Sequence, residues 1–188
     1  MAEEYIERSN NAVVLRDVEA PDLARIHDIH THYVLSGSTP ALHAADRTEL
    51  TRRAEAILAA GLPYLVATVN NVVVGYACAD VCRTLSADAQ ALEDSVYIIP
   101  GSRGHGLGSA LLSAVLARCQ GGPWKQMIAV IGEGANTAAI RLHERHGFVL
   151  VEVHSEAAKQ HDRPARAVVM QRKLRAGLTR VRAFPDIP

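Results

Sequence analysis

The stretch from Glu93 to Ser109 constrains the fold more than any other part of the sequence. It contains the run Val96 to Ile99, whose β-branched and aromatic residues favour a strand, and Pro100 ends that run. From Leu107 onward, apolar residues recur at helical spacing. The stretch therefore predicts a strand that leads through a turn into a helix. Four glycines lie at the junction: Gly101, Gly104, Gly106 and Gly108.

A glycine-rich turn at the start of a helix is suited to binding phosphate groups. Its backbone N–H groups are exposed without side chains in the way, and the helix dipole places about half a positive charge at that end. No lysine follows the glycines as a Walker loop requires, and their even spacing is one residue out of step with the dinucleotide-binding motif. An ordinary glycine-rich turn between a strand and a helix is the alternative interpretation.

The rest of the sequence predicts further strands and helices in close succession. Asp46 with Glu49 resembles a capping box, and Asn70-Asn71 suits a hairpin turn because asparagine tolerates positive φ. Gly147 is placed to end the last helix. We expect strands over residues 12–18, 63–69, 72–79, 124–131, 148–153 and 166–174, and further helices that begin near residues 21, 46 and 136.

This order of elements predicts a single domain of the α/β (α+β) class. A meander of strands followed by β-α-β units gives a mixed sheet with helices on both faces. The length of 188 residues suits one domain with a sizeable core. We expect residues 1–11 to be a flexible N-terminus, residues 12–174 to be the domain and residues 175–188 to be a tail, either an exposed extension or a strap onto a neighbouring subunit.

Charge and composition argue against several classes of protein. Lysine plus arginine and aspartate plus glutamate both number 20, so no nucleic-acid partner is expected to bind through bulk positive charge. No apolar run approaches ~18 residues and the acidic N-terminal segment lacks an apolar core, so neither a membrane span nor a signal peptide is expected. Three sparse cysteines, Cys78, Cys82 and Cys119, indicate reduced thiols and a cytoplasmic protein.

Two histidines raise the question of a metal site. His27 and His30 share one face of the first predicted helix, so a shared metal is conceivable. No carboxylate or thiol stands at ligand spacing beside them, and surface or pocket residues are the favoured interpretation. No metal is therefore expected.

Two motifs resemble those of the GCN5-related N-acetyltransferases (GNAT). The segment from Arg103 to Gly108 is similar to the family's Arg/Gln-x-x-Gly-x-Gly/Ala signature, whose loop holds the pyrophosphate of acetyl-CoA. The segment from Asn136 to Phe148 is similar to the family's Asn-x-x-Ala-x-x-x-Tyr-x-x-x-Gly-Phe/Tyr helix, with His143 where many members have tyrosine. The order of elements also agrees. The resemblance implies the acyl-CoA N-acyltransferase fold, with a mostly antiparallel sheet of six to seven strands.

Further segments resemble the phosphinothricin N-acetyltransferase branch of that family. The branch has Glu-Ser-Thr-Val-Tyr-Val, Gly-Leu-Gly-Ser, Ala-Val-Ile-Gly and Arg-x-His-Glu segments, which match residues 93–98, 106–109, 129–132 and 141–144 in the same order. Residues 88–93 and 159–165 depart from the branch pattern. Both segments surround the acceptor pocket in the family. Loops over residues 36–43, 83–92 and 155–165 are expected to decide which acceptor is used.

The resemblance implies an acetyl-CoA-dependent N-acetyltransferase. Its acceptor would be the amine of a small amino-acid-like compound of the phosphinothricin, methionine sulfoximine or methionine sulfone type, acetylated by direct attack in a ternary complex. Glu93 is the candidate base, because the amine must lose a proton before it attacks. His143 is the candidate acid or second base, and a histidine that only packs on the helix is the alternative.

Acetyl-CoA, the expected co-substrate, would lie along the strand and the glycine-rich turn. The main chain of Val96, Tyr97 and Ile98 would bind the pantetheine arm as if it were an added strand. The family also suggests a homodimer. The other expected cofactor-binding residues are Arg103, Gly104, His105, Gly106, Leu107, Gly108, Ser109 and Asn136.

Two other classes of function stay open at this point. One is a non-catalytic acyl-CoA-binding sensor on the same fold, against which the presence of Glu93 argues. The other is a nicotinamide-dependent oxidoreductase, with Glu133 as the ribose-binding acid. The glycine spacing and the strands that precede the turn disfavour the oxidoreductase.

Overall fold

The computed structural model describes residues 4–8, 11–36, 39, 45–82, 90–132, 137–160 and 163–174. Eight strands form one sheet in the order β1-β2-β3-β4-β5-β6-β8-β7. Within the described part of the chain, β5 and β6 pair in parallel and the other neighbours pair antiparallel. The strands are β1 (Glu4–Arg8), β2 (Asn11–Asp17), β3 (Tyr64–Val69), β4 (Val72–Val81), β5 (Ala91–Ile98), β6 (Gln126–Gly132), β7 (Val149–Gln160) and β8 (Arg163–Lys173).

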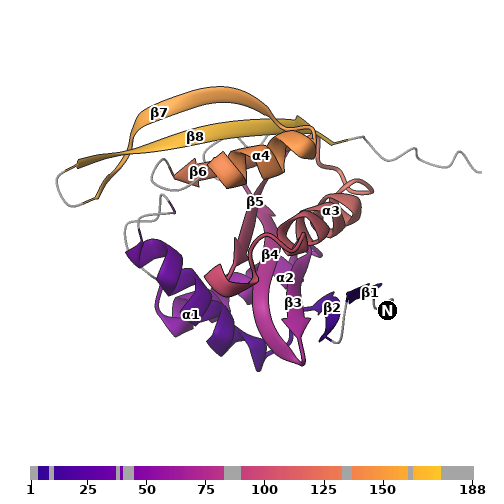
Figure 1. Cartoon of the computed structure of the whole chain (residues 1–188). Coiled ribbons are helices and arrows are strands. Elements are labelled where there is room, and N and C mark those ends of the chain that lie inside the picture. Colours follow the sequence, from indigo (N-terminus) through magenta and orange to yellow (C-terminus); the bar gives the residue numbers. More distant parts are fainter. Residues whose placement is uncertain are drawn as a thin grey trace, which may run out of the picture.

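Helices cover both faces of the sheet (Figure 1). They are α1 (Asp22–Leu35), α2 (Arg47–Ala59), α3 (Leu107–Cys119) and α4 (Thr137–Arg145), with a short 3₁₀ turn, η2 (Pro100–Ser102), before α3. The helices α1 and α2 lie on one face, and α3 packs on the other. Because β3 and β4 are covered from both sides, most of their residues are buried, which explains their nearly continuous apolar sequence. The predicted fold class is confirmed.

The two ends of the sheet differ from the expectation. Residues 1–11 were expected to be flexible, but Glu4–Arg8 forms β1 and pairs with β2, which adds an eighth strand to the expected six or seven. The prediction of a loop over residues 155–165 was wrong for most of that range, because β7 runs to Gln160 and β8 begins at Arg163. Both segments are polar, and their pairing with a neighbouring strand has no strong local signal in the sequence. The tail over residues 175–188 lies outside the described residues.

Local turn and capping signals appear where the sequence predicted them. The side chain of Asp46 accepts a hydrogen bond from the Glu49 N–H at 2.8 Å and caps α2. Asn70 and Asn71 adopt φ of 50° and 63° in the β3–β4 hairpin. The three cysteines are free and buried.

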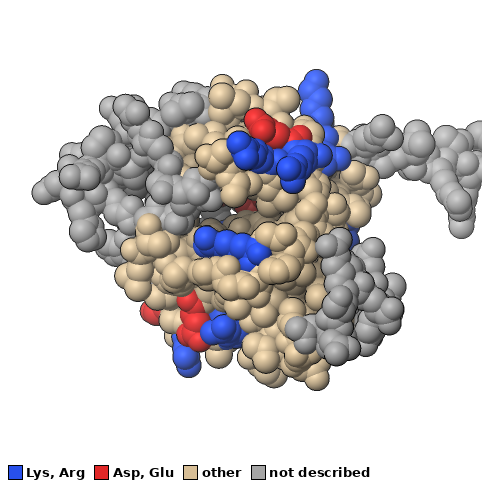
Figure 2. All heavy atoms as spheres, viewed as in Figure 1, with Lys and Arg blue, Asp and Glu red and all other residues tan. Residues whose placement is uncertain are grey.

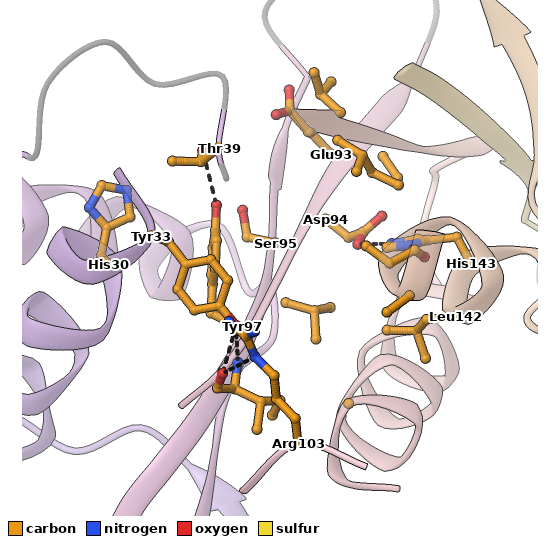
Figure 3. Close-up of a pocket in the computed structure, with 18 of the residues that line it drawn as sticks. His30, Tyr33, Thr39, Glu93, Asp94, Ser95, Tyr97, Arg103, Leu142 and His143 are labelled. Carbon is orange, nitrogen blue, oxygen red and sulfur yellow. Dashed lines mark hydrogen bonds and ion pairs between the residues drawn. The ribbon is translucent and has the colours of Figure 1, made fainter. Parts of the chain in front are cut away.

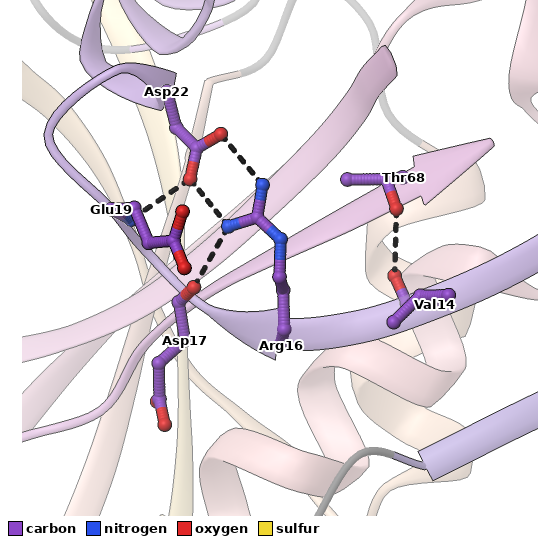
Figure 4. A network of polar contacts seen from close by, with 6 residues as sticks. All are labelled: Val14, Arg16, Asp17, Glu19, Asp22 and Thr68. Carbon is purple, nitrogen blue, oxygen red and sulfur yellow. Dashed lines mark hydrogen bonds and ion pairs between the residues drawn. The ribbon is translucent and has the colours of Figure 1, made fainter. Parts of the chain in front are cut away.

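An ion pair fixes the connection between β2 and α1 (Figure 4). The guanidinium of Arg16 donates to both carboxylate oxygens of Asp22, at 2.6 and 2.9 Å. Asp22 also accepts the N–H of Glu19 at 2.8 Å. Burial alone would raise the pKa of Asp22, but the bonds from Arg16 and Glu19 hold it below its usual value. The pair therefore anchors the start of α1, the helix that carries His30 and Tyr33 to the site described below.

The sheet opens between β5 and β6. These strands pair only from Ala91↔Gln126 to Asp94↔Ala129. Beyond that point β5 stays paired with β4 as far as Ile98, and β6 stays paired with β8 as far as Gly132. The two strands therefore separate into a fork, whose walls are residues 95–98 of β5 and residues 130–132 of β6.

Gly75 allows β4 to approach the β5 wall of this fork. A Cβ atom at position 75 would lie 2.8 Å from the carbonyl oxygen of Tyr97 and closer still to the Cδ1 atom of Ile98. We predict that Gly75→Ala lowers the free energy of unfolding by about 1–3 kcal/mol, measured by urea denaturation, because the main chain of β5 must shift. Gly121→Ala is the control, since a Cβ there meets nothing within 4 Å. Equal stability of the two variants would contradict the close approach.

Candidate active site

A cavity of about 520 Å³ lies at the fork and receives side chains from both faces of the sheet. The face of the molecule in Figure 2 is hollowed near its centre. The close-up in Figure 3 shows His30, Tyr33 and Thr39 on one side of β5, and Asp94, Leu142 and His143 on the other. We call these the α1/α2 side and the α4 side of the cavity. A single strand thus lies between two chemically different walls.

The main chain of β5 presents alternate residues to the fork. The N–H of Cys82 bonds to Ala91 O, and the N–H of Ile99 bonds to Val74 O. Because every second residue of an antiparallel strand bonds to its neighbour, the odd-numbered residues of β5 form the hydrogen bonds to β4. The main-chain groups of Val96 and Ile98 therefore face the fork, and those of Tyr97 do not. Cofactor binding by the main chain of Val96 and Ile98 stays a prediction, and Tyr97 reaches the cavity with its ring.

The main-chain N–H and C=O of Ile98 form hydrogen bonds with side chains in place of a neighbouring strand. The hydroxyl of Tyr33, from α1, donates to Ile98 O at 2.6 Å and accepts the Ile98 N–H at 3.3 Å. Arg103 also donates from Nε to Ile98 O at 3.4 Å, and its guanidinium lies 5.2 Å from the centre of the Tyr33 ring. The open edge of β5 is therefore adjacent to the glycine-rich turn.

The turn leads directly into α3. Gly104 and Gly106 have φ of +81° and +83°, which side chains rarely tolerate, and Gly106 is the residue that precedes α3. No side chain caps the helix, so the first N–H groups of α3 have no helical partner. Gly108 faces the fork, because a Cβ there would lie 3.9 Å from Val96 and 3.5 Å from Leu142. These are the features of an anion site at a helix N-terminus.

The other described residues predicted to bind the cofactor at the turn do not line the cavity with their side chains. Leu107 is buried in the core, so only its main chain is available. The hydroxyl of Ser109 lies 3.3 Å from Nε2 of His146. His105 is exposed on the turn. Asn136 lies outside the described residues.

His143 forms a buried pair with Asp94 on the α4 side. The Nε2 atom of His143 lies 2.9 Å from Oδ2 of Asp94, and Nδ1 lies 2.8 Å from the carbonyl oxygen of Ala139. The side chains are 6% and 1% exposed. Burial alone would lower the pKa of His143, but the hydrogen bond and charge of Asp94, together with Ala139 O, raise it above its usual value.

The pairing limits what His143 can do. Ala139 O can only accept, so Nδ1 must carry a proton, and the carboxylate of Asp94 is served best by a second proton on Nε2. Neither nitrogen then keeps a lone pair, so His143 cannot act as a base in this arrangement. The Oδ1 atom of Asp94 is buried and has no hydrogen-bond partner among the described residues.

Glu93 lines the same cavity from the α1/α2 side. It forms no hydrogen bond or ion pair with another described residue. Burial raises the pKa of Glu93 above its usual value; the charge of Arg53 opposes this rise, and Asp94 and Asp80 add to it. The carboxyl group is therefore available to exchange a proton, and its role as the base stays a prediction.

The structure thus brings most of the predicted residues into one cavity, and it adds residues that the sequence reasoning missed. Asp94 could have been noticed, since it stands where the related branch has serine. Arg53 has no local signal, because only the packing of α2 against β5 brings it to the cavity. His30, for which a surface or pocket position was expected, also lines the cavity. Among the described residues, no three His, Cys, Asp or Glu side chains gather as a metal site would require, and no helix is long and apolar enough to cross a membrane.

We predict that Asp94→Asn lowers the pKa of His143, measured by NMR titration of the imidazole ring. The wild-type ring should stay protonated above pH ~6.5, and the variant should lose its proton at lower pH, because burial is then opposed only by the bond to Ala139 O and no longer by the charge of Asp94. The raised pKa contributes stability that is fully present below pH ~6.5 and is lost as the pH rises through the folded-state value. The His146 ring, which contacts Ser109 and Ser113, is the internal control. An unchanged titration of His143 would show that Asp94 does not hold its proton.

Comparison with known proteins agrees with this geometry. The model of the acetyltransferase (GNAT) family matches residues 24–148. A phosphinothricin N-acetyltransferase of Alcaligenes faecalis is 42% identical over 175 residues, which cover 93% of this chain and 89% of that protein. An L-methionine sulfoximine/L-methionine sulfone acetyltransferase of Salmonella typhimurium is 34% identical over 141 residues, 73% of this chain and 81% of that protein.

Solved structures give the same result. The crystal structure of a GNAT superfamily phosphinothricin acetyltransferase from Sinorhizobium meliloti, in complex with acetyl-CoA, has a TM-score of 0.79 and 36% identity. The match covers 94% of this chain and 96% of that one. The predicted family, fold and enzyme class are confirmed. The chain belongs to the GNAT acetyltransferase family and is an acetyl-CoA-dependent N-acetyltransferase.

Proposed function

We propose that the protein acetylates the amine of a small amino-acid-like acceptor, of the phosphinothricin, methionine sulfoximine or methionine sulfone type. The observation that carries the proposal is the single cavity at the fork. It joins the glycine-rich turn and the open edge of β5 to a wall that holds the carboxyl group of Glu93, which is paired with no other described residue. The names of the relatives from Alcaligenes faecalis and Salmonella typhimurium support this acceptor class.

The cofactor would follow the elements of the fork. Its pyrophosphate would bind the N–H groups at the start of α3, beside Arg103. Its pantetheine arm would pair with the main chain of Val96 in place of the missing strand, and would pair with Ile98 only by replacing the Tyr33 hydroxyl and Arg103 there. The thioester would then lie near Asp94 and Ala129, where β5 and β6 rejoin. Asn136 stays a predicted cofactor contact.

The reaction would proceed by direct attack in a ternary complex. Glu93 takes a proton from the acceptor ammonium, directly or through a water, and the amine attacks the thioester carbonyl. A main-chain N–H of β5 that faces the fork stabilises the negative charge on the carbonyl oxygen. The CoA thiolate then leaves and is protonated. His143 can supply that proton only by giving up its bond to Asp94 or to Ala139 O.

We also propose a cytoplasmic homodimer. Val149, Leu150 and Val151 of β7 are 65%, 59% and 54% exposed at the edge of the described sheet, and such an apolar run favours burial against another chain. Basic and acidic side chains lie interspersed on the described part of the face in Figure 2, and the formal net charge is zero. Neither a nucleic-acid partner nor a membrane partner is proposed.

A panel of amines tests the proposed activity. Purified protein with acetyl-CoA should release thiol with methionine sulfone, methionine sulfoximine or phosphinothricin, and calorimetry should show acetyl-CoA binding. Binding without thiol release from any amine would favour the sensor. Release only with protein N-termini, lysine side chains or aminoglycosides would contradict the acceptor class.

We predict that Glu93→Gln lowers kcat/KM by roughly 10²- to 10⁴-fold, because the amide keeps the shape of the side chain but cannot accept the proton. The affinity for acetyl-CoA should not change, since the proposed cofactor contacts lie further along β5. The rising limb of the pH–rate profile should also change, since it reports the base and the amine together. Activity within a few-fold of wild type and an unaltered pH profile would place the base elsewhere.

We predict that Gly106→Val raises the Kd for acetyl-CoA by at least about tenfold, measured by calorimetry. Valine is strained at φ of +83° and its side chain obstructs the approach of phosphate to the helix N-terminus. Gly61→Val is the matched control, because Gly61 has φ of +69° in open space after α2. Both variants should lose stability, and unchanged affinity of the Gly106 variant would overturn the phosphate site.

A further inference from the structure

The α1/α2 side of the cavity contains an arginine that the reaction chemistry above does not use. Arg53 belongs to α2 and lines the cavity together with Glu93, His30 and Tyr97. Arg103, the other arginine among the described lining residues, lies at the glycine-rich turn and donates to Ile98 O. Arg53 is therefore the permanent cation of the wall that the acceptor would meet.

Part of the guanidinium of Arg53 is already engaged. Its Nε atom bonds to Oδ2 of Asp80 at 3.2 Å, and this bond fixes the direction of the side chain. The two terminal nitrogens make no hydrogen bond to any described residue. Because these nitrogens form the edge of the guanidinium that binds carboxylates in a bidentate manner, the free edge is a carboxylate site held in place by Asp80.

This wall carries two opposite charges, Arg53 and Glu93, that do not contact each other. Arg53 and Glu93 are near enough for the charge of each to shift the pKa of the other, but they form no ion pair, and Arg53 pairs with Asp80 instead. An α-amino acid carries an ammonium and a carboxylate on one carbon atom. It could therefore place its ammonium beside Glu93 and its carboxylate beside Arg53 at the same time.

His30 does not offer the same charge. Burial, the nearby charge of Arg53 and His27 all lower the pKa of His30, so its imidazole is neutral near pH 7. Its Nδ1 atom is buried without a hydrogen-bond partner among the described residues. A neutral imidazole can accept or donate one hydrogen bond to a substrate, but it cannot balance a carboxylate.

We propose that Arg53 binds the carboxylate of an α-amino-acid acceptor and so positions the amine beside Glu93. This inference rests on the proposed function and names the residue that selects its substrate class. It requires wild-type protein to prefer an amino acid over the same molecule without its carboxylate. The pair of acceptors that tests it is methionine sulfone and its decarboxylated analogue, 3-(methylsulfonyl)propylamine.

The decisive variant is Arg53→Met, which keeps the apolar stem and removes the cation. KM for methionine sulfone should rise about 10- to 100-fold, as expected for the loss of a hydrogen-bonded charge pair. The kcat/KM for the decarboxylated amine should stay within about threefold of wild type. Arg53→Lys, which keeps the charge without the planar fork, should give an intermediate KM. The affinity for acetyl-CoA, measured by calorimetry, should be unchanged. This result would show that the fold and the fork are intact in the variant.

Two matched controls separate carboxylate binding from other effects. Arg52→Met removes the neighbouring arginine, which pairs with Glu49 at the surface, and should leave both acceptors unaffected. Asp80→Asn weakens the bond that fixes the direction of the Arg53 side chain but keeps its cation, so KM for methionine sulfone should rise by less than in Arg53→Met, and the decarboxylated amine should be unaffected. A rise in KM with Asp80→Asn as large as with Arg53→Met, seen equally with the decarboxylated amine, would show that the ion pair itself is what matters and would overturn the proposal.

The remaining outcomes are also distinct. An equal loss with both acceptors in Arg53→Met, or no preference of the wild type for the carboxylated acceptor, would overturn the role of Arg53 and leave the acetyltransferase activity in place. Absence of thiol release from every amine with wild-type protein would instead overturn the proposed function, and the inference with it.

Discussion

The site depends on the early end of the pairing between β5 and β6. Each strand stays bound to its other neighbour, so the main-chain groups between them lose their strand partner beyond Asp94 and Ala129. Buried N–H and C=O groups are costly unless they are paired. The Tyr33 hydroxyl and Arg103 satisfy those of Ile98. A cofactor that adds as a strand would complete the sheet, so binding and sheet structure share the same hydrogen-bonding groups.

The alternation of side chains along β5 then divides the chemistry between two walls. Odd positions point toward α1 and α2, and even positions point toward α3 and α4, because successive residues of a strand face opposite sides. Glu93 and Tyr97 therefore meet the acceptor wall, whereas Asp94 and Val96 meet the wall near His143. One strand of eight residues can in this way contact two substrates without an intervening loop.

The sequence was informative where local chemistry decides the structure, and less so where packing does. The strand, glycine turn and helix around Gly106, the Asn70-Asn71 hairpin and the cap at Asp46 all follow from backbone preferences, and all are found. Glu93 and His143 were indicated by motif resemblance and do share the cavity. The β1 strand and the extension of β7 and β8 into one long hairpin were missed, because these segments are polar and carry no strong local strand signal, although each pairs with its neighbour in the sequence. Arg53 could not be placed at all, since α2 and β5 are brought together only by the tertiary fold.

The roles of the two neighbouring carboxylates, Glu93 and Asp94, follow from their cationic partners. Asp94 contacts His143 directly at 2.9 Å in a nearly dry environment, so its charge is neutralised and its geometry is fixed. Glu93 is influenced by the charge of Arg53 without contacting it, and burial raises the pKa of Glu93 toward the pH at which a base is most effective. The carboxylate of Asp94 is already engaged by His143, whereas that of Glu93 is bonded to no other described residue and only senses the charge of Arg53. The difference in partners, more than any difference in residue type, thus favours Glu93 as the base and leaves Asp94 to hold His143 in place.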